Sequence, residues 1–100
     1  MNRESLKRLN RILFRKWVST NDEFVTLADN GRQIIKAHVK WHQTCDSLGI
    51  ERLKRMGEDE FDPDGQILEE SIVLLDPAFY GTWLEMPKET AEKILVMGMP

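Results

Sequence analysis

The sequence predicts a mainly helical α+β protein, made of an N-terminal helical hairpin, a short β-hairpin and a C-terminal helix. Apolar residues recur at helical spacing through the first half, and the apolar run 72–75 is typical of a buried strand. Pro87 and Gly98 bracket a segment with the pattern of a short helix. The length of 100 residues predicts one small domain, 1–100, in which an acidic loop, 57–65, separates a helical first half from a mixed second half.

The first helix is expected over residues 4–18. Steps of three, three, one and four place one set of apolar side chains on a single face: Leu6, Leu9, Ile12, Leu13 and Trp17. Arginines occupy the opposite face. Ser19 and Thr20 are expected to end this helix, because both residues favour helix caps over helix interiors.

A second helix is expected over residues 32–48, up to the glycine at position 49. For residues 21–30 two structures compete. Thr20 and Glu23 have the spacing of a capping box, which would start the helix early. The segment Asp29-Asn30-Gly31 is instead typical of a hairpin turn, and Asp29 would then cap a helix that begins near Asn30.

The second half of the chain is expected to contain several short helices and strands. Residues 50–56 are expected to form a short helix that ends at Gly57. The segment 67–75 fits both a strand and a helical face; the strand is favoured because the turn after Asp76 leads into a second strand, 82–86. The last helix is expected over 88–97, with a buried face formed by Ala91, Ile94 and Leu95.

Composition excludes several classes of protein. No run of eighteen apolar residues is present, so no membrane association is expected. The single cysteine, Cys45, excludes an internal disulfide, and a cytoplasmic location is the expectation. Charge is unevenly distributed: residues 1–20 carry a net charge of +5 and residues 57–100 a net charge of −9. This asymmetry favours either an anionic partner for one end or pairing of the two ends.

Two constellations resemble ion sites. His38, His42 and Cys45 would share a helix face, but the sequence offers no fourth zinc ligand, so no metal site is predicted. The segment 60–67 resembles part of a calcium-binding EF-hand loop, with oxygen-bearing residues at alternate positions. It departs from that pattern at Ser71, where the bidentate glutamate should stand, so an ordinary acidic loop is expected.

No catalytic grouping is recognisable, so the sequence predicts a protein without enzymatic activity and without a cofactor. The leading hypothesis is a small protein-interaction or regulatory module that binds a protein partner or a second copy of itself. The contact residues predicted for it are Leu6, Leu9, Leu13 and Trp17. The alternative is a nucleic-acid-binding regulator that uses the basic face of the first helix, formed by Arg8, Arg11, Arg15 and Lys16.

Overall fold

The computed structural model confirms the α+β class. It describes residues 1–25, 30–54, 64–78 and 81–98, and of residues 21–25 and 30–38 it describes the backbone alone. Within those ranges the elements are α1 (Arg3–Val25), α2 (Asn30–Ser47), β1 (Glu51–Lys54), β2 (Gln66–Ile67), β3 (Ser71–Leu75), β4 (Thr82–Pro87) and α3 (Lys88–Met97).

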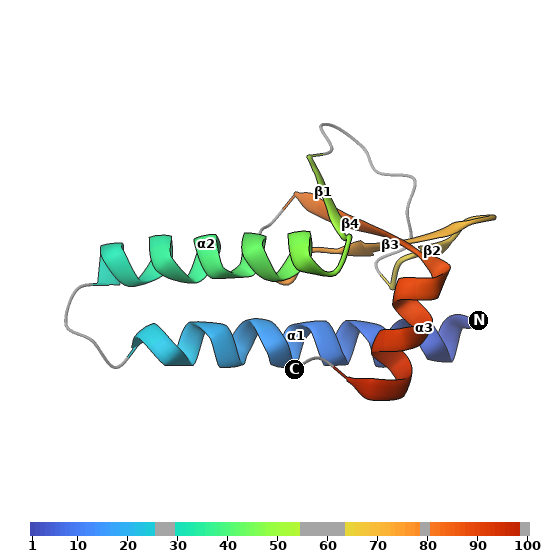
Figure 1. Ribbon diagram of the computed structural model, residues 1–100, viewed down its shortest axis with the longest axis horizontal. Coiled ribbons are helices and arrows are strands. Elements are labelled where there is room, and N and C mark those ends of the chain that lie inside the picture. The colour runs from blue at the N-terminus through green and yellow to red at the C-terminus, as the bar shows by residue number, and fades with distance from the viewer. Residues whose placement is uncertain (26–29, 55–63, 79–80, 99–100) are drawn as a thin grey trace.

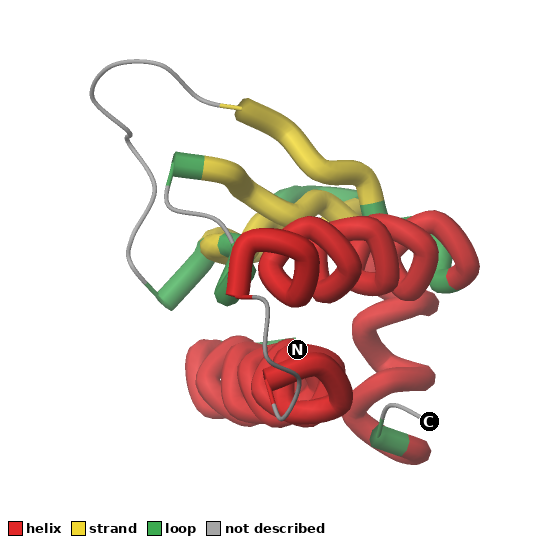
Figure 2. The backbone as a smooth tube through the Cα atoms, turned by 90° about the vertical axis from the view of Figure 1, so that its left-hand side faces the viewer, coloured by secondary structure: helices red, strands yellow, loops and turns green. Residues whose placement is uncertain are grey.

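The helices lie on one side of a four-stranded antiparallel sheet (Figures 1 and 2). The strand order is β1-β4-β3-β2, so the strands that pair most extensively, β3 and β4, occupy its centre. α1 and α2 run antiparallel and pack along each other, and α3 packs against α1 and β4. Figure 2 shows that α1 lies farther from the sheet than α2 does.

α1 extends seven residues beyond the predicted end at position 18, so the prediction that Ser19 and Thr20 break it is wrong. Thr20 is buried, and its hydroxyl donates a hydrogen bond of 2.9 Å to the carbonyl oxygen of Lys16. A threonine satisfied in this way by the carbonyl four residues earlier is compatible with a helix interior. The capping box is therefore wrong as well, since Thr20 does not cap a new helix.

α2 begins at Asn30, close to the predicted start, whereas Asp29 lies outside the described residues. Its end follows the prediction. Gly49 adopts a φ of 70°, and the amide of Ile50 donates to the carbonyl oxygen of Cys45 at 2.9 Å. Glycine is favoured at such a left-handed position because it has no Cβ.

The short helix predicted at 50–56 is wrong, because residues 51–54 form β1 and pair with β4. A four-residue segment has little intrinsic preference, and the open edge of β4 provides the hydrogen-bond partners that decide its conformation. The strand at 82–86 and the helix at 88–97 are confirmed as β4 and α3. The strand predicted over 67–75 is confirmed only over 71–75, as β3, because Ile67 belongs to the two-residue β2, which pairs with β3, and residues 68–70 lie between the two strands.

The core fills the space between the inner face of the sheet and the helices. Alternate residues of β3 and β4 point inward: Ile72, Leu74, Leu84 and Met86. They meet leucines of α1, Trp41 and Cys45 of α2, and the predicted buried residues Ala91 and Ile94 of α3. The core thus joins all three helices to the central strands.

Candidate functional site

The leucines predicted to contact a partner are already used within the chain. Leu6 is 4% exposed and Leu9 and Leu13 are 0% exposed, all within the core cluster. Trp17 is half-buried and packs edge-on against Trp41, with ring centroids 5.9 Å apart. The expectation that this face remains available is therefore wrong, because the sheet and α2 cover it.

The basic face predicted for α1 does lie on the surface. Arg8, Arg11 and Arg15 are exposed and Lys16 is half-buried. Arg8 has an internal role, because its guanidinium donates a hydrogen bond of 2.9 Å to the carbonyl oxygen of Leu95 in the last turn of α3. A cation at that position stabilises a helix C-terminus.

Two apolar residues on this exposed side of α1 are missing from the sequence prediction. Phe14 is 56% exposed and Val18 is 38% exposed. Together with Arg11 and Arg15 they follow steps of three and four along the helix, so the four side chains are neighbours. We call this set (Arg11, Phe14, Arg15 and Val18) the outer stripe of α1. The helical spacing that identified the arginines could also have identified Phe14.

A second cluster of functional groups surrounds Asp76, immediately after β3. The Asp76 side chain is fully buried and is contacted by four donor nitrogens of three residues. The indole nitrogen of Trp41 and the amide of Ala78 donate to Oδ1, at 2.9 and 2.8 Å. Arg52 approaches Oδ2 with both Nε and a terminal nitrogen, each at 2.8 Å. Four donors satisfy a buried carboxylate that would otherwise be strongly destabilising.

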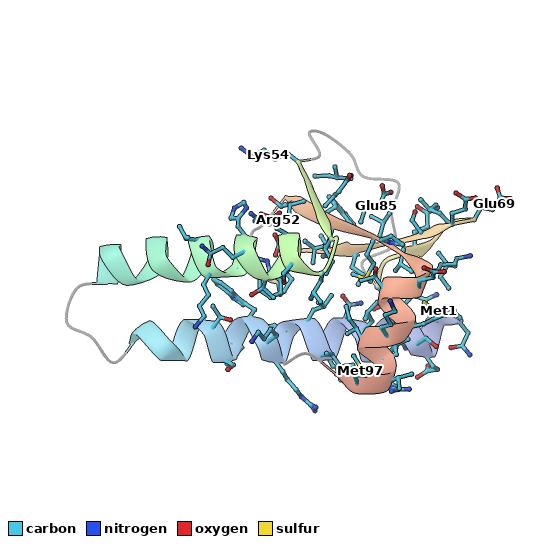
Figure 3. All side chains as sticks on the ribbon, in the orientation of Figure 1. Met1, Arg52, Lys54, Glu69, Glu85 and Met97 are labelled. Carbon is cyan, nitrogen blue, oxygen red and sulfur yellow. The ribbon has the colours of Figure 1, made fainter. Side chains whose placement is uncertain are left out.

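Arg52 connects this buried carboxylate to the surface. Its other terminal nitrogen, Nη1, lies against both ring nitrogens of His42 on α2. Among the described residues, Arg52 and His42 line a cavity of about 300 Å³ together with Lys54 and Thr82. Figure 3 shows Arg52 and Lys54 on β1, with Lys54 at the end of the strand. We call this hollow the Arg52 cavity.

The structure does not assemble the histidine and cysteine constellation. Cys45 is fully buried in the core, whereas His42 is exposed, and the side chain of His38 lies outside the description. Loss of hydration raises the pKa of the Cys45 thiol to about 12, and the nearby Asp76 carboxylate adds to the rise. A thiol in this state is a poor metal ligand. No group of three or more metal-binding side chains occurs among the described residues.

Most of the calcium-like segment 60–67 lies outside the described residues. At its described end, the Asp64 carboxylate pairs with the guanidinium of Arg3 at 3.0 Å. The backbone carbonyl of Asp64 also accepts a hydrogen bond of 2.8 Å from the Asn10 side chain. The carboxylate and the backbone carbonyl of Asp64 therefore both contact α1.

No protein family, curated protein or solved structure matches this chain. In the part of the chain that the structure describes, none of the helices has the length and apolar character needed to cross a bilayer.

Proposed function

We propose that the protein is a non-enzymatic interaction module that binds an acidic protein segment through the outer stripe of α1. The observation that carries the proposal is Phe14, an aromatic side chain that is 56% exposed and has Arg11 and Arg15 as helix neighbours. Exposed aromatic residues beside arginines are typical of contact surfaces. The cytoplasmic location expected from the sequence belongs to the same proposal.

The two kinds of side chain have different roles in this proposal. Covering an exposed phenylalanine contributes roughly 1.5–3 kcal/mol, so Phe14 and Val18 would supply most of the affinity. Exposed ion pairs contribute about 0–1 kcal/mol each. The arginines would therefore select an acidic partner and orient it.

Charge argues against a symmetric dimer formed through this stripe. Two copies placed stripe to stripe would bring Arg11 and Arg15 of each chain near those of the other, and like charges repel. Self-association would instead require the stripe to meet the acidic C-terminal half of a second copy. Such a head-to-tail contact generates rings or filaments.

Nucleic acid is the second candidate partner, supported by the exposed row of Arg8, Arg11 and Arg15. Two observations make it weaker. Arg8 is engaged with the C-terminal turn of α3, and the apolar Phe14 lies within the row. The net charge of −9 on residues 57–100 also opposes binding to a polyanion.

The proposal is tested by NMR titration of the labelled protein with two synthetic amphipathic peptides, identical except that glutamates in one are lysines in the other. We expect the acidic peptide to shift the amide signals of α1, and Phe14→Ser to weaken its binding about tenfold or more. Val39→Ser is the matched control, because Val39 is 51% exposed and lies on α2. It should leave the affinity unchanged.

Three results would contradict the proposal. They are an acidic peptide that does not bind, equal effects of Phe14→Ser and Val39→Ser, and equal binding of both peptides. Binding of duplex DNA with a steep salt dependence, lost on charge reversal of Arg8, Arg11 and Arg15, would support the second candidate instead. Growth to large species with concentration in sedimentation would identify a second copy as the partner.

A further inference from the structure

We propose that the Arg52 cavity is a binding site for a phosphate group of a small molecule. The residues that line the cavity belong to α2, β1 and β4, and Asp76, which holds Arg52, follows β3, so the inference does not depend on the outer stripe of α1.

The base of the cavity is preorganised. Arg52 has a side chain that is only 11% exposed, and two of its nitrogens contact one oxygen of the fully buried Asp76. Trp41 and Ala78 hold the other oxygen, so the carboxylate that orients the arginine is itself held on both sides. A guanidinium oriented in this way loses less side-chain entropy when it binds an anion.

Three further polar side chains line the same cavity as the guanidinium. Lys54 lies two residues after Arg52 on the same strand, which places both side chains on one face of the sheet. Thr82 lies opposite Lys54 in the register of β1 and β4 and contributes a hydroxyl. His42 reaches the cavity from α2 and has its ring beside Arg52. The described lining therefore combines guanidinium, ammonium, imidazole and hydroxyl groups.

Among the described residues, no carboxylate lines the cavity. Asp76 contacts Arg52, but its side chain is fully buried and does not belong to that lining. Asp76 offsets the charge of Arg52, so the remaining positive charge comes chiefly from Lys54. This predicts weak, Lys54-dependent anion binding. We infer phosphate as the ligand class, because its several oxygens can accept hydrogen bonds from more than one side chain of the lining at once.

An ion pair that merely stabilises the fold is the competing explanation for Arg52 and Asp76. Such a pair needs neither Lys54 nor the cavity. The effect of a Lys54 substitution on ligand binding therefore separates the two explanations, whereas a substitution at Asp76 would disturb both binding and folding.

The experiment is an NMR titration of the full chain with inorganic phosphate at constant ionic strength and neutral pH, with acetate as the comparison anion. We expect phosphate to shift the amide signals of residues 52–54 and of Thr82 in a saturable way, and more strongly than acetate. Lys54→Met should weaken phosphate binding about tenfold. Lys93→Met, which removes an exposed lysine of α3, should have no effect.

A non-saturable response, or equal effects of Lys54→Met and Lys93→Met, would overturn the site. Equal binding of acetate would overturn its assignment to phosphate. Circular dichroism of each variant checks that the fold is retained. Phe14→Ser should leave phosphate binding unchanged, so failure of this proposal and failure of the proposed function can be distinguished.

Discussion

At the scale of single residues, Asp76 joins three parts of the chain, two of which are distant from it in sequence. It accepts hydrogen bonds from α2, from β1 and from the turn that follows β3. Its position before Pro77 predicts only a turn, since Asp-Pro is a common turn sequence. That Asp76 also receives Trp41 and Arg52 depends on elements 35 and 24 residues away, which sequence spacing does not reveal.

Gly65 is a position where a side chain is excluded. Its φ is +107°, and a Cβ would lie 2.6 Å from the carbonyl oxygen of Val73 and 2.6 Å from Cδ2 of Leu74. We expect Gly65→Ala to cost about 1 kcal/mol for the backbone conformation and a further ~1–3 kcal/mol for the collision. Urea unfolding measures the difference. Gly49→Ala is the control, because Gly49 also has a positive φ but has open space around it; an equal loss in both variants would contradict the collision.

Cys45 makes stability depend on alkaline pH. Its folded pKa of about 12 lies above its ordinary value of 9.0, so between these two values the unfolded chain loses the thiol proton and the folded chain keeps it. The free energy of unfolding should therefore fall as pH rises through this window, by up to about 1.4 kcal/mol per pH unit, and should be unaffected by this group below it. Cys45→Ala should unfold with a shallower alkaline dependence, measured by urea titration at several pH values. Identical slopes for both proteins would refute this.

At the scale of elements, the ends of α1 show how local signals and tertiary contacts differ in importance. The side chain of Asn2 accepts a hydrogen bond of 3.0 Å from the amide of Ser5, which is the geometry of an N-cap. The opposite end continues through Thr20 to Val25, although local propensity predicts an earlier end. Packing of α1 along α2 extends the helix beyond its intrinsic stop signal.

Removing the cap tests the local contribution to α1. Asn2→Ala should destabilise the protein by about 1 kcal/mol, because it leaves an amide of the first turn without its partner. Thermal unfolding followed by circular dichroism is a suitable measurement. Ser19→Ala, at an exposed position within the same helix, should leave the stability unchanged or slightly raised. If the cap substitution were as harmless as this control, the hydrogen bond would not contribute to stability.

At the scale of the whole molecule, the amphipathic pattern of α1 serves the core on one side and the surface on the other. The leucine face was expected to be free for a partner, but β3, β4 and α2 supply enough apolar surface to cover it. The opposite side keeps its arginines exposed, together with Phe14 and Val18. Any contact with a partner through α1 therefore has to use the side that the sequence marks as basic.

Truncation of a core leucine tests whether the leucine face of α1 packs within the chain or contacts a second chain. Leu9→Ala should lower the free energy of unfolding by about 2–5 kcal/mol, because Leu9 is fully buried and its truncation leaves a cavity. The folded fraction should sediment as the unmodified protein does. A variant of unchanged stability that instead loses self-association would show that Leu9 lies at an interface between chains.

The sequence by itself determined the α+β class, the central strands, the last helix and the basic side of α1. These features follow from periodicity and from proline and glycine signals, which act over one or two turns of chain. The tertiary structure decided that residues 51–54 form a strand, that α1 continues through Thr20 and that Leu6, Leu9 and Leu13 are internal. It also brought Trp41, Arg52 and Asp76 together. Each of these depends on which surface lies opposite, and residues distant in the chain supply that surface.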